Sequence, residues 1–315
     1  MIKITKKRLK ALLSPSGVYK LIHWAFLTNG YSRYLSDEKW TKIQYRASTG
    51  KKLDLQHPVT YNEKLQWLKL NDHNPMYTKL VDKRLVKDYV KDKIGDEYVI
   101  PTLAVWWSAD DIDFSILPDQ FVLKTNHSGG NTGVAICKDR KSFDFVKAKQ
   151  KMSRSLQTDA YSVSREWPYK NVRRCIIAEP YMEDSKTGEL RDYKFFCFDG
   201  EPKALFVATE RQKREEPCFD FFDTEYNHLN LKCSHPQAET PPEKPASFEI
   251  MLELSRKLSA GFAHVRVDLY EINGKPYFGE LTLYHWEGLM PFYPEKWNRI
   301  FGDWLKLPGI INHDE

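Results

Sequence analysis

FVLKTNHSGGNTGV, residues 121–134, is the stretch from which the fold can be worked out. A short apolar run ends at Lys124, and small, hydroxylated and glycine residues follow it as far as Gly133. Two strands joined by such a loop offer backbone N–H groups that wrap an anion, with a cation beside them. The pattern also fits a plain glycine-rich hairpin whose lysine extends to water. The rest of the chain has to decide between these two interpretations.

Length and charge narrow the class of protein. The 315 residues are enough for two lobes around a cleft. The 48 Lys and Arg are interspersed with 43 Asp and Glu, which gives a net charge of +5. This balance argues against a nucleic-acid-binding protein with a basic stripe. It suits acidic small molecules, anionic polysaccharide or an anionic membrane surface.

The cysteines indicate the redox compartment. They are odd in number, none stands at C-x-x-C spacing, and three lie in apolar, strand-like runs. This predicts reduced core thiols in a cytoplasmic protein. A zinc site built from Cys218, His228, Cys233 and His235 would match no common zinc spacing.

The N-terminal segment is basic and contains no run of the roughly 20 apolar residues that cross a membrane. Lys3 to Lys10 carry most of the charge, and Ser14–Gly17 interrupts the short apolar run that follows. Together with Lys20, Trp24 and Phe26, these cations fit an anionic membrane surface. A solvated basic helix explains the same residues, so peripheral membrane contact is one of two interpretations.

Residues 37–93 have a helical pattern rich in charge. Thr60-x-x-Glu63 predicts a capping box at the start of one helix. A second helix is expected from Leu80 to Tyr89, with Asp82 near its beginning. Both helices would belong to the part of the chain that precedes the glycine-rich loop.

Strands are predicted at residues 98–101, 175–182, 193–198 and 203–209, the last two joined by an Asp-Gly hairpin turn. Residues 210–246 are polar and proline-rich, which is typical of a long excursion over the surface. The strands therefore lie on both sides of a long irregular segment.

The last diagnostic segment is a hairpin. His264–Tyr270 and Tyr277–Thr282 alternate in polarity around Asn273-Gly274, a strong short-range hairpin signal. Asp268 and Glu280 are expected to lie close together on the polar faces of these strands. Two adjacent carboxylates repel each other unless a cation lies between them, and Mg²⁺ is the usual cation at a phosphate site. A hairpin with solvated charges is the alternative.

In their order and spacing, these segments resemble the ATP-grasp superfamily, and within it the TupA-like family of surface-polysaccharide gene clusters. The resemblance covers roughly residues 35–300. The segments that carry it are TYNEKLQW (60–67), VDK (81–83), IP (100–101), FVLK (121–124), DYKFF (192–196), RVDLY (266–270) and GELT (279–282).

The resemblance implies an α+β protein with the ATP-grasp fold: two α+β lobes whose antiparallel sheets grip ATP, after a mostly helical N-terminal segment. The implied divisions are a basic helical segment (1–36), an N-terminal lobe (37–118), a small ATP-grasp lobe with the glycine-rich lid (119–182) and a large lobe with the magnesium and acceptor site (183–315).

The resemblance also implies which residues bind ATP. Lys83 and Lys124 would reach the phosphates, Glu179–Met182 would read adenine, and Asp192 would contact ribose. The implied nucleotide-binding residues are Lys83, Lys124, Asn126, Ser128, Gly129, Gly130, Thr132, Gly133, Glu179, Tyr181, Met182, Asp192 and Lys194.

Catalytic and acceptor residues are implied in the same way. Arg266 and Lys124 would stabilise the transferring phosphoryl group. Mg²⁺ would be held by Asp268, Glu280 and Thr282, although many ATP-grasp enzymes have asparagine at the last of these positions. His285, Trp286 and Glu287 depart from the proline- and glycine-rich run expected there, and they are the candidates for acceptor contact.

The implied activity is ATP-dependent ligation of a carboxylate to an amine through an acyl phosphate. The substrates would be an amino acid and a hexuronic acid of a capsule or O-antigen unit, and no nucleic acid would take part. The opposite assignment, an amino-acid carboxylate joined to an amino sugar, remains open. ATP and Mg²⁺ are the implied cofactors.

Three other classes are weighed against this one. A glycosyltransferase of the same pathway would use Asp111-Ile112-Asp113 as a D-x-D motif, although such a triplet is more often a solvated turn. A protein-kinase-like enzyme would place its glycine loop before the lysine and carry D-F-G, and neither holds here. A carbohydrate-binding module would use the 9 Trp and 17 Tyr but leaves Lys124, Asp268 and Glu280 unexplained.

Overall fold

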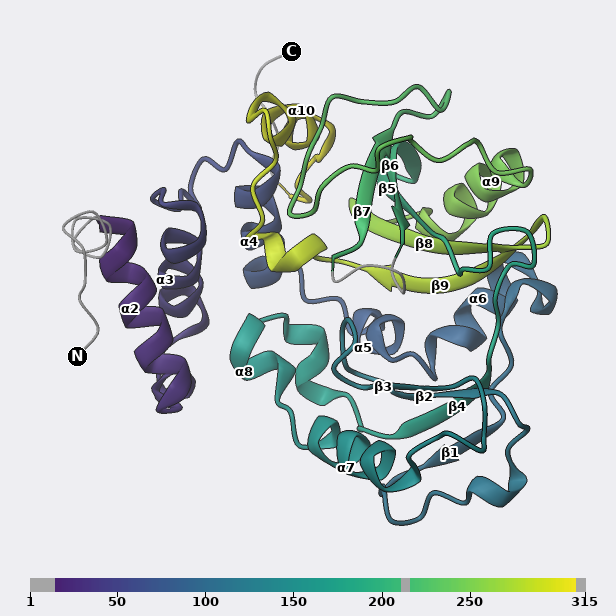
Figure 1. Ribbon diagram of the computed structural model, residues 1–315. Helices are drawn as coiled ribbons and strands as arrows, with labels where there is room; N and C mark the ends of the chain where they lie inside the picture. Colours follow the sequence, from purple (N-terminus) through teal and green to yellow (C-terminus); the bar gives the residue numbers. More distant parts are fainter. Residues whose placement is uncertain (1–14, 211–215, 310–315) are drawn as a thin grey trace. The chain divides into compact units, whose positions relative to one another are not determined.

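The computed structural model describes residues 15–210 and 216–309, with side chains from Gly17 onward (Figure 1). The chain divides into two compact units. Unit 1 comprises Met1–His73, Tyr161–Trp167 and Tyr284–Glu315, and unit 2 comprises Asn74–Ala160 and Pro168–Leu283. The basic stretch from Lys3 to Lys10 lies outside the described residues. The four divisions predicted from the sequence stay a prediction.

The described part of unit 1 is helical. The predicted capping box at α4 is confirmed, because Thr60 accepts from the backbone of Glu63 and the Glu63 side chain accepts from the backbone of Thr60. Packing of α4 against α10 and of α2 against α3 builds the unit. Its elements are α2 (Pro15–Thr28), η1 (Tyr31–Tyr34), α3 (Asp37–Thr49), α4 (Tyr61–Asn71), η5 (His285–Gly288) and α10 (Lys296–Trp304).

Unit 2 contains a small antiparallel sheet in the order β1-β4-β2-β3. Alternate residues of β2 are buried, and they form a core with Met152 of helix α7. The sheet and its helix are β1 (Ala104–Trp106), β2 (Phe121–Thr125), β3 (Val134–Cys137), β4 (Ile176–Pro180) and α7 (Phe145–Leu156). The glycine-rich stretch thus joins two paired strands, as the sequence predicts.

A larger antiparallel sheet in the order β7-β6-β5-β8-β9 completes unit 2. Helix α9 packs against β5, β6 and β8 through its apolar stripe. The elements are β5 (Asp192–Phe198), β6 (Glu201–Thr209), β7 (Cys218–Phe222), α9 (Phe248–Ser259), β8 (His264–Ile272) and β9 (Lys275–Thr282). The two hairpins predicted from Asp-Gly and Asn-Gly turns are confirmed.

The helix predicted from Leu80 to Tyr89 is two helices, α5 (Met76–Val81) and α6 (Val86–Ile94). The break falls at Asp82, whose Oδ1 accepts hydrogen bonds from the backbone of Arg84 and Leu85. Such a side chain offers the backbone an alternative to continuing the helix. Figure 1 shows α5 and α6 between the two sheets, with α7 and α9 on the outer faces.

Two further predictions are corrected. The strand expected at residues 98–101 is only an isolated bridge from Val99 to Phe278, preceded by η2 (Asp96–Tyr98). The excursion at residues 210–246 contains β7, a fully buried edge strand that the sequence pattern missed. Short elements fill the rest: η3 (Phe114–Ile116), α8 (Ala160–Ser164) and η4 (Trp167–Asn171).

Two predictions about composition can be checked directly. All five cysteines are free and buried, as expected of core thiols. Among the described helices, none is long and apolar enough to cross a membrane. The α+β class with two antiparallel sheets, preceded by a helical segment, is confirmed.

Candidate active site

The polar face of the large sheet carries a buried ion cluster around Asp268. Arg266 donates from Nε to Asp268 Oδ1 and from Nη2 to Oδ2, both at 2.7 Å. Lys194 of the neighbouring strand also donates to Oδ2 and forms an ion pair with Asp192 at 2.6 Å. Burial favours the neutral acid, but Arg266 and Lys194 outweigh it and lower the pKa of Asp268. The carboxylate therefore stays ionised.

Glu280 lies directly opposite Asp268 in the β8–β9 register, as predicted. Its Oε1 accepts a hydrogen bond from Lys83 Nζ at 2.9 Å. Burial opposes ionisation of Glu280 and Asp268 repels it, yet Lys83 leaves its pKa below the usual value. Thr282 is close by, since its hydroxyl accepts from Arg266 Nη2 at 2.9 Å. Hence the predicted metal and phosphate residues of this sheet form one contiguous group.

The small sheet carries a second ion cluster, centred on Glu179 of β4. Lys124 Nζ lies 2.5 Å from Glu179 Oε2, and Lys87 Nζ lies 2.5 Å from Oε1. Burial raises the pKa of Glu179, but the two lysines outweigh it and the net shift is downward. Lys124 thus stands on β2 with its ammonium group held by an ionised, buried carboxylate.

The α5–α6 junction and the first turn of α6 connect the two sheets through two lysines. Lys83 reaches Glu280 of the large sheet, and Lys87, four residues later, reaches Glu179 of the small sheet. The backbone N–H of Lys83 also donates to the carbonyl of Asn126 at 2.9 Å. Lys87 was not among the predicted site residues. Lys87 follows Lys83 by four positions, and in the single helix predicted there the two lysines would be neighbours, which could have drawn attention to Lys87.

The glycine-rich loop is closed tightly at its base and open at its tip. The backbone N–H of Thr125 donates to the Gly133 carbonyl, and the Thr125 hydroxyl bonds to those of Ser128 and Ser155, both at 2.7 Å. A Cβ at Gly133 would lie 2.0 Å from the Thr125 hydroxyl. The exposed tip is formed by Gly129, Gly130, Asn131 and Thr132. The predicted lid therefore has a fixed hinge and a solvent-facing tip.

Asn126 was predicted to contact nucleotide, but its side chain has structural partners. Its amide donates to Asp82 Oδ2 at 2.8 Å and to the Arg173 carbonyl, and it accepts from the backbone of Cys175. These bonds tie the start of the lid to the α5–α6 junction. The geometry thus gives Asn126 a role in holding Lys83 and the lid base.

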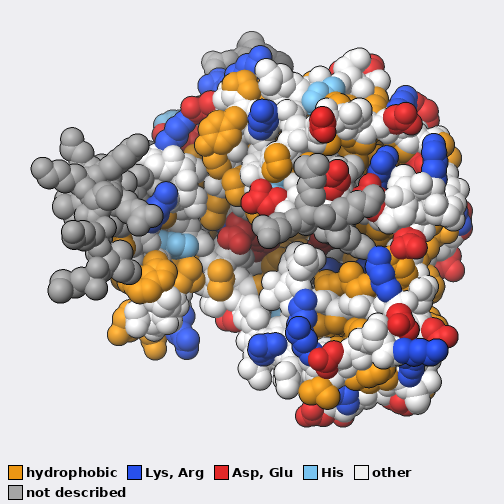
Figure 2. All heavy atoms as spheres, viewed as in Figure 1, with side chains coloured by type: hydrophobic (Ala, Val, Ile, Leu, Met, Phe, Trp, Pro, Cys, Tyr) orange, Lys and Arg blue, Asp and Glu red, His pale blue; other side chains and the backbone are white. Residues whose placement is uncertain are grey.

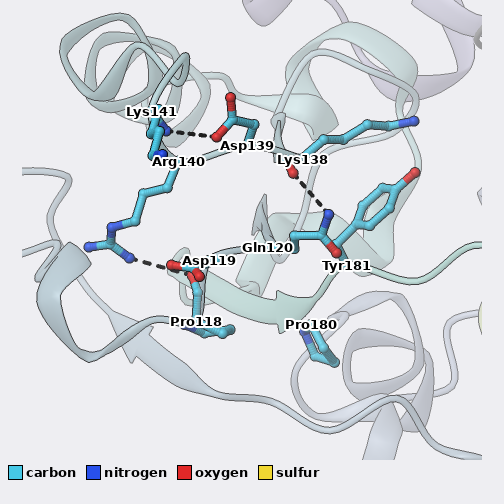
Figure 3. A pocket seen from close by; sticks show the side chains of 9 residues that line it. All are labelled: Pro118, Asp119, Gln120, Lys138, Asp139, Arg140, Lys141, Pro180 and Tyr181. Atoms are coloured by element: carbon cyan, nitrogen blue, oxygen red, sulfur yellow. Dashed lines mark hydrogen bonds between the residues drawn. The ribbon is translucent and has the colours of Figure 1, made fainter.

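The predicted adenine-reading residues follow Glu179 at the end of β4. Tyr181 donates from its hydroxyl to Glu183 Oε2 at 2.5 Å, and Lys138 Nζ lies 5.1 Å from its ring centre. Figure 3 shows Tyr181 and Lys138 on one side of an open hollow of about 840 Å³. Neither Lys83 nor Lys124 lines this hollow. The nucleotide roles of Tyr181 and Met182 stay predictions.

Asp268, Glu280 and Thr282 suit Mg²⁺ because they offer the hard oxygen donors that this ion prefers. No group of three or more His, Cys, Asp or Glu arranged for a metal occurs among the described residues. Mg²⁺ commonly takes one or two carboxylates and completes its shell with substrate phosphates and water. Of the two carboxylates predicted to bind the metal, Glu280 is the more accessible, since its side chain is 30% exposed and that of Asp268 is 1% exposed.

The candidate acceptor residues form a left-handed turn in unit 1. Trp286 and Glu287 have φ of 47° and 58°, and Gly288 continues the turn at 69°. Gln66 of α4 fixes it by donating to the carbonyls of Glu287 and Gly288 at 2.9 and 2.7 Å. Consecutive non-glycine residues in this conformation cost energy and are found mainly at functional sites. His285 is buried beside this turn, whereas Trp286 is exposed.

Behind this turn lies Lys69, which the sequence did not single out. Its side chain is 1% exposed, and Nζ donates to the Ser164 carbonyl at 3.1 Å. Burial lowers its pKa to about 8, although Glu166 and Glu287 oppose the shift. Conversely, burial raises the pKa of Glu287. The ionised forms of both groups are therefore disfavoured here.

The residues of the rival interpretations have ordinary structural roles. Asp113 accepts from the backbone of Ser115 at 2.8 Å and caps η3, while Ile112 of the D-x-D triplet is buried. His228 bonds to the buried carboxylate of Asp220 at 3.1 Å. No metal cluster occurs around it in the described ranges.

Two antiparallel sheets, a glycine-rich loop directly after a strand lysine, and an acidic hairpin paired with cations are together the features of an ATP-grasp protein. The profile of the TupA-like ATP-grasp family matches residues 63–306, and the chain belongs to that family. This confirms the family predicted from the sequence. No curated protein matches the chain.

Solved structures with a similar fold include D-alanine–D-alanine ligases. The enzyme of Bacillus anthracis is 17% identical, with 66% of this chain and 59% of that chain covered and a TM-score of 0.38. The enzyme of Helicobacter pylori is 16% identical over 74% and 60%, with a TM-score of 0.42. D-cycloserine synthetase DcsG is 15% identical over 78% and 70%, with a TM-score of 0.39. The chain thus spans about three fifths of the length of the two alanine ligases.

Proposed function

We propose that the protein is an ATP-dependent carboxylate–amine ligase. The observation that carries the proposal is the pairing of lysines with carboxylates on both sheets: Lys124 with Glu179, and Lys83 with Glu280. Each lysine pairs with its carboxylate in the absence of ATP, and it can exchange this partner for the more highly charged triphosphate when ATP binds. The sites are buried enough to strengthen electrostatic interactions with a triphosphate.

In the first step, a carboxylate oxygen of one substrate attacks the γ-phosphorus of ATP, and ADP leaves. Lys83 and Lys124 exchange carboxylate partners for phosphate oxygens. Arg266, held in plane by Asp268, faces the charge that develops on the transferring group. Asp268, Glu280 and Thr282 would hold Mg²⁺, which would supply Lewis-acid neutralisation of the phosphate charge.

In the second step, the amine of the other substrate attacks the acyl carbon. The amide bond forms, inorganic phosphate leaves and the amine loses a proton. Closure of the lid at Ser128–Gly133 would exclude water from the acyl phosphate. Its glycines suit this movement, because added Cβ atoms at Gly129 and Gly130 would meet nothing within 4 Å.

We further propose a hexuronic acid as the carboxylate substrate and an amino acid as the amine. One support is the family, because the TupA-like proteins that this sequence resembles belong to surface-polysaccharide gene clusters. A second support is the mildly basic net charge of the chain, which suits acidic sugars. The exposed Trp286 is the proposed acceptor contact, since an indole face packs well on a sugar ring and Gln66 holds the carbonyls of the next two residues of the turn. A cytoplasmic location, in part on the inner membrane face, completes the proposal.

The test is ADP release from Mg-ATP by the purified protein, with uronic acids and an amino-acid pool added singly and together. ADP that requires both additions supports the ligase, and dividing the pool identifies the amine. ADP release that ignores both additions contradicts it. Turnover of a nucleotide sugar, with no ADP from ATP, would establish the glycosyltransferase instead.

A further inference from the structure

Two arginines of unit 2 lie at the ring of one exposed tryptophan. Trp107, which directly follows β1, is 43% exposed. The guanidinium carbon of Arg173 lies 3.9 Å from the centre of its ring, and that of Arg84 lies 5.7 Å from it. These three residues form the arginine–tryptophan cluster. None of them has a role in the proposed reaction.

The arginines of this cluster lack the acidic partners that other surface cations have. On the face shown in Figure 2, Lys and Arg side chains lie next to Asp and Glu over unit 2. Arg256, for example, pairs with Glu201 at 3.0 Å. Among the described residues, neither Arg84 nor Arg173 forms an ion pair. Two like charges at one ring repel each other, and a bound anion would relieve this repulsion.

Stacking on the indole keeps the donors of Arg173 available to a ligand. A guanidinium is planar, and its five N–H groups point outward in that plane. At 3.9 Å the guanidinium lies against the face of the ring, a contact that uses none of these donors. The arginine can therefore bind two oxygens of a carboxylate or a phosphate side by side.

A buried hydrogen-bond network holds the backbones of both arginines. The Asn126 amide donates to the Arg173 carbonyl at 3.0 Å and to Asp82 Oδ2 at 2.8 Å. Asp82 Oδ1 accepts from the backbone N–H of Arg84 at 2.8 Å. Asn126 is fully buried, and Asp82 is 2% exposed. The segments that carry the two guanidiniums are thus fixed before a ligand arrives, which lowers the cost of binding it.

The edge strand β1 adds an apolar surface beside the cluster. Leu103, Val105 and Trp107 alternate along the chain and are 41, 37 and 43% exposed. Trp106, between the last two, faces the opposite way and is buried in the core of the small sheet. Apolar surface with a few placed polar groups is typical of sites for small organic ligands. An acidic sugar, with its C–H groups and its oxyanion, matches both parts of this surface.

The cluster lies at the end of the small sheet where the glycine-rich loop begins. Trp106 of β1 and Thr125 of β2 both pair with Ile176 of β4, one on each side. Trp107 comes directly after the first of these pairs, and the loop comes directly after the second. The two are separated by the width of about two strand spacings, or roughly 10 Å. A saccharide on the cluster would therefore lie within about two sugar units of the loop.

We infer that the arginine–tryptophan cluster is a subsite for an acidic saccharide, whose oxyanion binds Arg84 and Arg173 and whose sugar ring contacts Trp107. The oxyanion is a uronate carboxylate or a sugar phosphate, which share this chemistry. The inference rests on the proposed function for the saccharide nature of the ligand. The sugar held here is a neighbour of the reacting unit, because the reacting carboxylate has to approach the ATP phosphates instead.

The test is titration calorimetry of the full chain without ATP, using trigalacturonate, the neutral trisaccharide maltotriose and glucose 1-phosphate. We expect trigalacturonate to bind at least about tenfold more tightly than maltotriose. Arg84→Gln with Arg173→Gln should weaken this binding at least about tenfold, and Trp107→Ala should weaken it as well. Arg256→Gln, at an exposed position of α9, is the matched control and should bind as wild type.

Two single variants at Arg173 separate binding from folding, because this residue is exposed. Arg173→Gln should already weaken trigalacturonate binding severalfold. Arg173→Lys keeps the charge but loses the planar donors, so it should restore only part of the affinity. Thermal unfolding at the wild-type temperature shows that the variants are folded.

Undiminished trigalacturonate binding by the double variant would overturn the inference. So would equal binding of maltotriose and trigalacturonate by wild type, or no binding of any of the three probes. Tighter binding of glucose 1-phosphate, lost in the double variant, would support the subsite with phosphate as its oxyanion. If ADP release requires a uronic acid but the double variant binds trigalacturonate as wild type does, the subsite is wrong and the ligase stands.

Discussion

Glu280 and Glu287 are seven positions apart in the sequence and lie in opposite electrostatic situations. Glu280 contacts Lys83 at 2.9 Å, and although burial works against its charge, its pKa is lowered. Glu287 has Lys69 in its neighbourhood, but the two side chains interact only through their charges, without a hydrogen bond between them. Burial raises its pKa, and Lys69 offsets only part of the change.

The lysines differ in the same way. Lys83 keeps a contact partner, while Lys69 is buried with one carbonyl bond, and burial lowers its pKa to about 8. A buried charge with a partner in contact stays ionised, and that is what binding a triphosphate requires. A buried charge without one moves toward its neutral form, which suits positioning or proton transfer. The four predictions below test this contrast.

The largest effect is expected at Glu280. Glu280→Gln removes the charge that holds Lys83 and the more exposed metal ligand, so ATP turnover should fall about 100- to 1,000-fold. Glu271→Gln is the matched control on the same hairpin, where the carboxylate bonds to Ser247. Steady-state ADP release measures both. Turnover by Glu280→Gln at the level of the control would refute the metal assignment.

The next effect concerns Lys69 and depends on pH. Its pKa is about 8 when folded and 10.5 when unfolded, so the unfolded chain binds more protons between these values and stability rises with pH there. Between pH 8 and 10.5, the free energy of unfolding of wild type should increase by about 3 kcal/mol relative to that of Lys69→Met, at about 1.4 kcal/mol per pH unit. Urea unfolding across this range measures the difference. If the difference in unfolding free energy between wild type and Lys69→Met does not change with pH, burial does not lower the pKa of Lys69. Lys42→Met, at an exposed position, is the control.

A smaller effect is expected at Lys124. Lys124→Ala removes one charged contact to phosphate and leaves Glu179 with Lys87 alone, so the Kd for Mg-ATP should rise about 10- to 100-fold. Titration calorimetry measures this, with the exposed strand residue Lys203→Ala as control. Unchanged affinity would remove the glycine-rich loop from the nucleotide site.

The smallest effect is expected at Glu287. The pKa of Glu287 is higher in the folded chain than in the unfolded chain, where it is 4.5. The neutral acid therefore contributes stability below pH 4.5, and this stability is lost as the pH rises through the pKa of the folded chain. Glu287→Gln should therefore unfold at slightly higher urea than wild type at pH 7, by at most about 1 kcal/mol, and lose this advantage below pH 4.5. A variant that is less stable than wild type at pH 7 would contradict the account.

Sequence reasoning found the residues whose pattern is local. The Asn-Gly turn and strand alternation placed Asp268 opposite Glu280, and that register is confirmed. Glycines after a strand lysine placed the loop after Lys124 between two paired strands. Period and turn chemistry specify such contacts directly, because both partners belong to one hairpin.

Contacts between distant segments were not predictable in this way. Lys87 and Glu179 are 92 positions apart, and Lys69 meets the Ser164 carbonyl across 95. The break at Asp82 was missed because the helical pattern continues through it, whereas its side chain forms bonds that end the helix. Strand β7 was missed because its buried Asp220 gives the strand a polar residue that only the fold explains.

The measurement that tests the central claim most directly follows oxygen from the carboxylate substrate. A uronic acid labelled with ¹⁸O in its carboxylate is incubated with Mg-ATP, the amine and the protein, and the released phosphate is analysed by mass spectrometry. An acyl-phosphate ligase transfers one labelled oxygen to each phosphate as the amide forms. Phosphate without label would show that the carboxylate of the uronic acid does not receive the γ-phosphoryl group, and the proposed ligation of that acid would be wrong.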